Sequence, residues 1–188
     1  MSSFSNGFSV LRHRDFTLYM TARVLSTIAV LMQSVAIGWQ VYASTGDVFD
    51  LGLVGLAQFA PFLALILVAG HVADRYNRRN IIATCFGMQL TCALLLLWYT
   101  LGGFSGIGMV LGVLVLFGGA RAFMTPASQA IVVNMVPPES LGKAVALSTS
   151  AFQLAVIVGP TLGGLLYLAG PAVVYGVVAT LLVGSISL

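Results

Sequence analysis

Charged side chains are scarce in this chain. They make up 7% of its 188 residues, whereas ordinary soluble domains are roughly one-quarter charged. Hydrophobic residues make up 59%, and the mean hydropathy is +1.04. Such a chain lacks the polar residues that a water-exposed surface requires, so we expect a membrane protein in contact with the lipid bilayer. The net charge of +3 then gives no ground for nucleic-acid binding, because basic residues in a membrane protein report its orientation first.

The residues of metal sites and active sites are also few. Cys85 and Cys92 are the only cysteines, and on a helix they would lie ~10 Å apart, beyond the reach of a disulfide. His13 and His71 stand apart from any other cluster of ligands. No grouping of His, Cys, Ser and Asp provides a nucleophile or a metal site, so we expect neither an enzyme nor a bound metal or cofactor. The N-terminus also lacks the apolar core of a signal peptide.

The apolar residues fall into six long stretches. A helix that spans a bilayer needs about 20 mostly apolar residues. The expected spans are residues 16–43, 51–72, 80–101, 106–134, 142–169 and 171–188. Because the segments between them are short, neighbouring spans must run antiparallel. The sequence therefore predicts an all-α membrane protein made of one six-helix bundle, preceded by a segment over residues 1–15.

The basic residues between the spans indicate an orientation. With a cytoplasmic N-terminus, the cytoplasmic side holds Arg12, Arg14, Arg75, Arg78, Arg79 and Lys143. The opposite side then holds Asp47 and Asp50 and no basic residue. Since Lys and Arg are retained in the cytoplasm during insertion, we expect a multi-pass cell-membrane protein with residues 1–15 in the cytoplasm.

The sixth stretch is short, with ~18 residues for a whole bilayer. We expect either the first half of a longer protein or a half-length unit that needs a second chain.

A charged motif separates the second and third spans. Its pattern is Gly-x-x-x-Asp-Arg-x-x-Arg-Arg, formed by Gly70, Asp74, Arg75, Arg78 and Arg79. Any cytoplasmic turn carries basic residues, but an acid contributes little to topology, so Asp74 indicates a specific pairing with an arginine or a helix N-terminus. Val72 and Asn77 also lie within this motif, at two positions where the related pattern of a known transporter superfamily has Leu and Gly. Because Asn tolerates a left-handed backbone, we expect Asn77 to preserve the turn.

This motif resembles the signature of the major facilitator superfamily of secondary transporters, at the same place between the second and third spans. The resemblance implies two six-helix halves, a small-molecule substrate and no cofactor. It also implies that the acid and the arginines form a cytoplasmic latch between the halves. A bacterial inner membrane is the expected location.

The fifth span carries a second motif. Small residues recur every four positions at Ala151, Ala155, Gly159 and Gly163, a spacing that allows another helix to pack closely. Together with Pro160 and Gly164, this run resembles the antiporter motif of the same superfamily, which implies export. A close helix contact alone would also explain the small residues.

Several short segments resemble the branch of that superfamily that contains the enterobactin exporter and multidrug efflux proteins. They are LRHRDFTLYMTARVLS, GWQVY, GLVGLAQFAP and ARAFMTPASQAIV.

Two arginines fall inside the spans, where a charge is costly unless it faces a cavity or a partner. On a helix, Arg121 shares a face with Thr125 and Ser128, with Gln129 at its edge, so we expect these residues to line a pathway. The superfamily motif for this span, Arg-x-x-Gln-Gly, matches only at Arg121, which weakens the transfer of a role in proton coupling.

Span one carries Arg23 and a stripe that includes Gln33 and Gln40, seven residues apart. These three could also line the pathway. Alternatively, Arg23 could extend to the headgroups and Gln33 could hydrogen-bond a neighbouring helix. Arginines on the pathway would favour an anionic or polar ligand.

No Asp or Glu lies deep in any span. A carboxylate is the usual proton carrier of antiporters, so a coupling proton would need an acid outside this half. The sequence thus predicts a secondary transporter that exports drug-like or siderophore-like molecules by alternating access. The alternative is a partner-dependent bundle without transport of its own.

Overall fold

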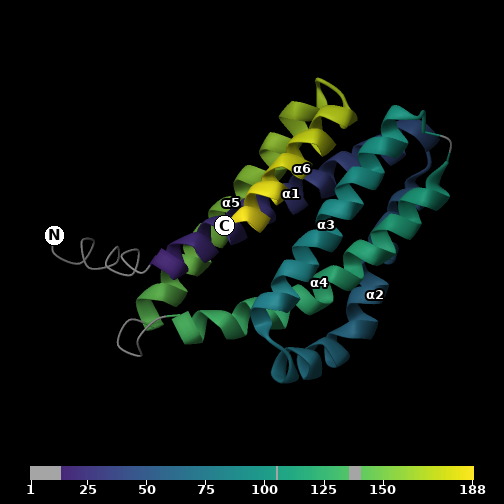
Figure 1. The fold of residues 1–188 in the computed structure, drawn as a ribbon. Helices are drawn as coiled ribbons and strands as arrows, with labels where there is room; N and C mark the ends of the chain where they lie inside the picture. The colour runs from purple at the N-terminus through teal and green to yellow at the C-terminus, as the bar shows by residue number, and fades with distance from the viewer. Residues whose placement is uncertain (1–13, 105, 136–140) are drawn as a thin grey trace.

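The computed structural model describes residues 14–104, 106–135 and 141–188. This part of the chain is helical and contains no strand. The helices are α1 (Arg14–Thr45), α2 (Val48–Arg75), α3 (Arg78–Leu101), α4 (Ile107–Met135), α5 (Leu141–Tyr167) and α6 (Pro171–Ser187), as Figure 1 shows. Helices α1 to α5 are long and apolar enough to cross a bilayer, and α6 is a shorter apolar helix of 17 residues. The expected all-α bundle is confirmed.

The turn between α1 and α2 shows why the helices extend beyond the apolar stretches. Gly46 has a φ of +68° and donates its N–H to the Tyr42 carbonyl at 2.9 Å, which closes the last turn of α1. Asp47 then caps α2, because its Oδ1 accepts the Phe49 N–H at 2.8 Å. The polar residues at these ends are therefore helical, although they lie outside the apolar stretches from which the spans were predicted.

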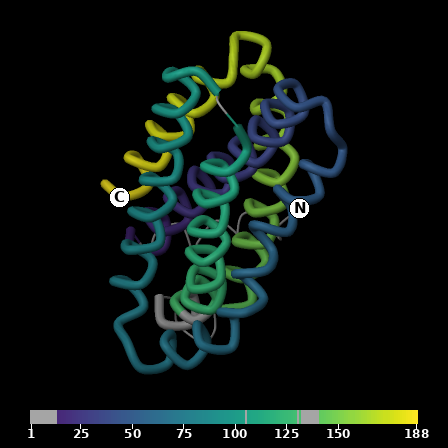
Figure 2. Tube along the Cα trace, turned by 90° about the vertical axis from the view of Figure 1, so that its right-hand side faces the viewer, coloured from purple at the N-terminus to yellow at the C-terminus, as the bar shows by residue number. Residues whose placement is uncertain are grey.

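The packing of the helices follows one linear order. The most extensive contacts join α2 to α4, α4 to α3, α3 to α6, α6 to α1, and α1 to α5. Figure 2 shows α4 lying between α3 and α2. If α1, α2 and α3 are exchanged with α4, α5 and α6, the same order is obtained, read from the other end. The bundle is therefore an inverted repeat of two three-helix units, an architecture found in many secondary transporters.

The main core lies in the middle of this order. Phe117, Leu96, Tyr175 and Met32, from four different helices, are each at most 2% exposed. By contrast, the outermost helices α2 and α5 bury few of their apolar side chains, and many of these side chains are exposed. Their outer faces are suited to lipid or to further protein.

Helices α2 and α4 pack against each other at a glycine. A Cβ atom on Gly118 would collide with the Gln58 carbonyl oxygen and lie 2.8 Å from Cγ of Pro61. The absence of a side chain at Gly118 therefore lets the two backbones approach, as small residues do in membrane bundles.

Candidate functional site

A polar hollow of about 360 Å³ lies among α1, α3, α4 and α5. Five of the residues expected along a pathway line it, namely Arg23, Arg121, Thr125, Ser128 and Gln129. The structure therefore brings together polar groups from α1 and α4 that are about 100 positions apart in the sequence. Its volume is within the range of small-molecule sites in proteins, ~300–1,000 Å³.

Arg23 is held in place by α5. Its guanidinium donates to Ser148 Oγ at 3.0 Å and lies 5.8 Å from the ring centroid of Phe152, within cation–π range. Arg23 is half-buried and lines the hollow. The structure therefore places Arg23 against α5 and at the hollow, and its role in a pathway stays a prediction.

Arg121 lies just before a bend in α4. Pro126 has no N–H to donate to the preceding turn, and Figure 1 shows α4 changing direction in this region. Thr125 bonds the Arg121 carbonyl at 3.0 Å. The Arg121 guanidinium itself has no hydrogen bond or ion pair with any described residue, and no Asp or Glu is among the described residues that line the hollow. A cation within a span is thus left without a counter-ion in this part of the chain.

Gln89 on α3 also lines the hollow, although its sequence context gave it no role. It is 3% exposed, and its Oε1 has no hydrogen-bond partner among the described residues. Only the neighbours that the fold brings to α3 distinguish Gln89 from an ordinary polar residue in a span.

The two glutamines expected with Arg23 do not line this hollow. Gln40 is in a buried cluster, where its Oε1 accepts the Tyr175 hydroxyl at 2.7 Å and its Nε2 donates to Thr100 at 3.0 Å. Gln33 is 1% exposed, and its Nε2 has no hydrogen-bond partner in the described part of the chain. Gln40 therefore joins α1, α3 and α6, and the hydrogen bond expected for Gln33 is not formed.

The charged motif forms a very short turn. Tyr76 and Asn77 alone separate α2 from α3. Asn77 has φ −62° and ψ 115°, and its side chain accepts the Arg79 N–H at 3.0 Å. The expected turn is therefore present, but Asn77 forms it with an extended backbone as the cap of α3 and not with a left-handed one.

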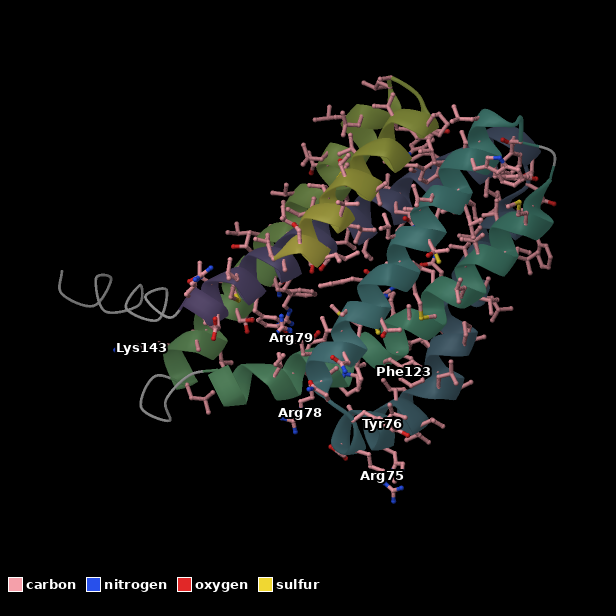
Figure 3. The ribbon with its side chains drawn as sticks, in the orientation of Figure 1. Arg75, Tyr76, Arg78, Arg79, Phe123 and Lys143 are labelled. Atoms are coloured by element: carbon pink, nitrogen blue, oxygen red, sulfur yellow. The ribbon has the colours of Figure 1, made fainter. Side chains whose placement is uncertain are left out.

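The charged side chains of the motif diverge. Asp74, Arg75 and Arg79 are exposed, and Figure 3 shows Arg75 projecting from the bundle while Arg79 lies toward α1. No ion pair joins Asp74 to another described residue, so the pairing expected for Asp74 is not formed within them. Asp74, Arg78 and Arg79 instead border a shared hollow of about 350 Å³ at this end of the bundle. A Cβ on Gly70 would meet nothing within 4 Å.

The glycine motif of α5 packs against α1. A Cβ on Gly159 would lie 2.8 Å from Leu31 Cβ, and one on Gly163 would lie 2.9 Å from Met32 Cα. Ala155 is 1% exposed on the same face, whereas a Cβ on Gly164 would meet nothing within 4 Å. Pro160 is half-buried between these glycines. The close helix contact that the spacing predicted is therefore present, and Gly164 lies outside it.

Three further residues hold the hollow together and had not been singled out in the sequence. Ser148 and Phe152 bind Arg23, and the Tyr19 hydroxyl donates to the Ser128 carbonyl at 3.0 Å. The sequence shows only that Ser148 and Phe152, four residues apart, lie on one face of α5. It does not identify Arg23 as their partner. The described residues contain no cluster of three or more His, Cys, Asp or Glu side chains that could hold a metal.

Comparison with known proteins agrees with this architecture. Residues 5–187 match the model of a family described as transmembrane secretion effector. The enterobactin exporter EntS of Shigella boydii serotype 18 is 33% identical, over 84% of this chain and 38% of that protein. EntS of Citrobacter koseri is also 33% identical and EntS of Escherichia coli O1:K1 is 32% identical, with the same coverage. The chain thus spans 38% of the length of these relatives. With six helices in an inverted repeat and a match over nearly its whole length, the chain belongs to the transmembrane secretion effector family of the major facilitator superfamily.

Proposed function

We propose that this chain is one half of an exporter of small organic molecules, and that the hollow is half of its substrate pathway. The observation that supports this most strongly is the convergence of Arg23, Arg121 and Gln89 on one hollow within a largely apolar bundle. Polar groups are retained inside spans chiefly where a substrate or a water-filled path requires them. The relatives are named enterobactin exporters, so enterobactin or a similar siderophore is the first substrate to test.

A second six-helix half would complete the pathway. The exposed apolar faces of α2 and α5 are available to contact it, and the relatives are long enough to contain it. We propose that the two halves rock about the hollow and expose it to one side of the membrane at a time. A coupling proton would be carried by an acid in the second half, because no carboxylate of the described residues lines the hollow.

Asp74 would act as part of the latch between the halves. It is exposed, it lacks an ion-pair partner among the described residues, and it borders a hollow with Arg78 and Arg79. An acid from this chain could therefore pair with a basic group or a helix N-terminus of the second half. In the proposed orientation this end of the bundle lies in the cytoplasm of a bacterial cell, beneath the inner membrane.

The test is export from cells that lack their own siderophore exporter. The gene is expressed as wild type, as Asp74→Asn and as Asp50→Asn, and secreted enterobactin and the accumulation of a fluorescent dye are measured. We expect Asp74→Asn to lower export about tenfold, which corresponds to the loss of one charge-assisted hydrogen bond. Asp50→Asn makes the same chemical change at the opposite end of the bundle and should leave export unchanged.

If wild-type cells secrete no more enterobactin and retain as much dye as cells without the gene, the transport proposal is wrong. The chain would then be the partner-dependent bundle without transport of its own. If export is normal in the Asp74→Asn variant, the transport proposal is supported and the proposal that Asp74 forms a latch is wrong.

A further inference from the structure

The two arginines of the hollow are in different chemical situations. Arg23 already has partners in the chain, since it donates to Ser148 at 3.0 Å and lies over the Phe152 ring at 5.8 Å. These contacts tie α1 to α5 and fix the direction of the Arg23 side chain. Arg121 has no comparable partner among the described residues, although it lines the same hollow.

The Arg121 guanidinium is exposed to the hollow and has no protein partner among the described residues. Arginine stays protonated in proteins, and a charge within the membrane normally faces a cavity or pairs with an opposite charge. The described acids do not serve Arg121, because Asp15, Asp47, Asp50 and Asp74 lie at helix ends and none of them lines this hollow. Arg121 is exposed at the hollow, so its guanidinium is open to water or to a ligand, and any counter-charge would come from outside the described residues.

Gln89 is an independent observation that indicates a ligand. Its side chain is 97% buried, it lines the hollow, and its Oε1 has no hydrogen-bond partner. Leaving a buried amide oxygen unpaired costs about as much as losing a hydrogen bond. A primary amide both donates and accepts, and a half-turn of its end group exchanges the two atoms. The Oε1 atom is itself buried, so Gln89 can pair with a ligand that carries a polar hydrogen once its amide has turned to present the oxygen to the hollow.

Part of the wall is apolar. Phe152, Val30 and Val156 contribute carbon surface to the hollow of about 360 Å³. A small inorganic anion would leave this surface wet, whereas an organic body would cover it.

We propose that the hollow binds an organic anion that also carries a hydroxyl or N–H group, and that Arg121, not Arg23, pairs with the acidic group. Gln89 accepts the polar hydrogen, and Arg23 is a positioning residue that holds Phe152 against the apolar part of the ligand. This inference rests on the proposed transport function, and it names the class of substrate that the pathway takes.

The test is binding to the purified protein, as its gene encodes it, in lipid nanodiscs. The probes are 3-hydroxybenzoate, its neutral counterpart 3-hydroxybenzamide, and benzoate, which lacks the hydroxyl. Equilibrium dialysis measures the dissociation constant of each. We expect 3-hydroxybenzoate to bind at least about tenfold more tightly than 3-hydroxybenzamide, as a charge-assisted hydrogen bond implies.

Variants assign this preference to residues. We expect Arg121→Gln to abolish the preference for the anion and Arg121→Lys to retain part of it, because lysine keeps the charge but loses the planar fork. Gln89→Leu should remove the advantage of 3-hydroxybenzoate over benzoate. Lys143→Gln removes an exposed charge outside the hollow and should change none of the three constants.

Equal binding of the anion and the amide by the wild-type protein overturns the proposal, and this comparison needs no variant to fold. Such a result is expected if a carboxylate of the protein itself neutralises Arg121. Loss of the preference in Arg23→Gln but not in Arg121→Gln overturns the assignment. Binding is measured without transport, so a protein that binds the anion but exports nothing contradicts the proposed function and leaves this inference intact.

Discussion

Gly163 and Gly164 are adjacent in the sequence but face different surroundings. A Cβ on Gly163 would lie 2.9 Å from Cα and 3.0 Å from the carbonyl oxygen of Met32, so the obstacle is backbone that cannot rotate away. A Cβ on Gly164 would enter open space. Substitutions at Gly163 therefore test the packing of α5 on α1, whereas substitutions at Gly164 test any contact that α5 makes outside this bundle.

We predict that Gly163→Ala destabilises the protein by about 1–3 kcal/mol, the usual cost of overpacking. Gly164→Ala adds the same methyl group and should change the free energy of unfolding by less than about 0.5 kcal/mol. Titration of the purified protein with SDS in mixed micelles, followed by circular dichroism, measures both. Equal losses in the two variants would show that α5 does not pack on α1 through Gly163.

At the residue scale, the sequence predicted the features that repeat. The four-residue spacing of small residues predicted the close face at Gly159 and Gly163, because a helix places such positions on one side. The helical spacing of Arg121, Thr125 and Ser128 similarly predicted part of the hollow. Gln89 could not be predicted, since a single polar residue has no spacing and its role depends on neighbours from other helices. Asn77 was misjudged because its conformation follows from where α3 begins.

At the scale of helices, Gln40 joins three of them inside an apolar core. Its amide accepts from Tyr175 on α6 and donates to Thr100 on α3, at 2.7 and 3.0 Å. In a dry interior these groups have no water as an alternative partner. The cluster therefore fixes how α1, α3 and α6 are aligned along their axes, which apolar contacts alone specify less sharply.

We predict that Tyr175→Phe lowers the free energy of unfolding by about 0.6–1.7 kcal/mol, between the mean and the maximum measured for hydrogen bonds between membrane helices. Tyr42→Phe removes a hydroxyl from an exposed tyrosine of α1 and should have little effect. The same SDS titration compares the two. If Tyr175→Phe is as stable as Tyr42→Phe, the cluster contributes no net stability.

The sequence predicted the helices but not their neighbours. Hydropathy and short turns were sufficient for a six-helix bundle, because each span needs a continuous apolar stretch. They did not reveal the inverted repeat. The surfaces through which α2 contacts α4 and α1 contacts α5 are largely apolar on both sides, and such a pattern does not show which helix packs against which. Pro126 could be seen in the sequence, but where α4 leads after its bend depends on the helices around it.

For the whole molecule, orientation is the property on which the transport proposal depends. Arg75, Arg78, Arg79 and Lys143 lie at one end of the bundle, as Figure 3 shows, and Asp47 and Asp50 lie in and beside the α1–α2 turn. This asymmetry favours a cytoplasmic location for the α2–α3 turn.

We predict that Val48→Cys reacts with a membrane-impermeant maleimide in intact spheroplasts and that Tyr76→Cys reacts only after the membrane is opened. The two positions are matched, because Val48 is 70% exposed and Tyr76 67% exposed. The wild-type protein is the background control, since Cys85 and Cys92 are buried. The reverse labelling pattern would place the arginines outside and would exclude the proposed cytoplasmic latch.

The turn of Tyr76 and Asn77 has a mechanical consequence. Two residues provide almost no slack, and Asn77 is itself fixed by its bond to the Arg79 N–H. If the proposed latch moves Asp74, helices α2 and α3, of 28 and 24 residues, have no flexible segment between them to absorb the movement. Helix α2 lies at the edge of the bundle and α3 at its centre. The turn would therefore transmit a movement of the outer helix to the middle of the molecule.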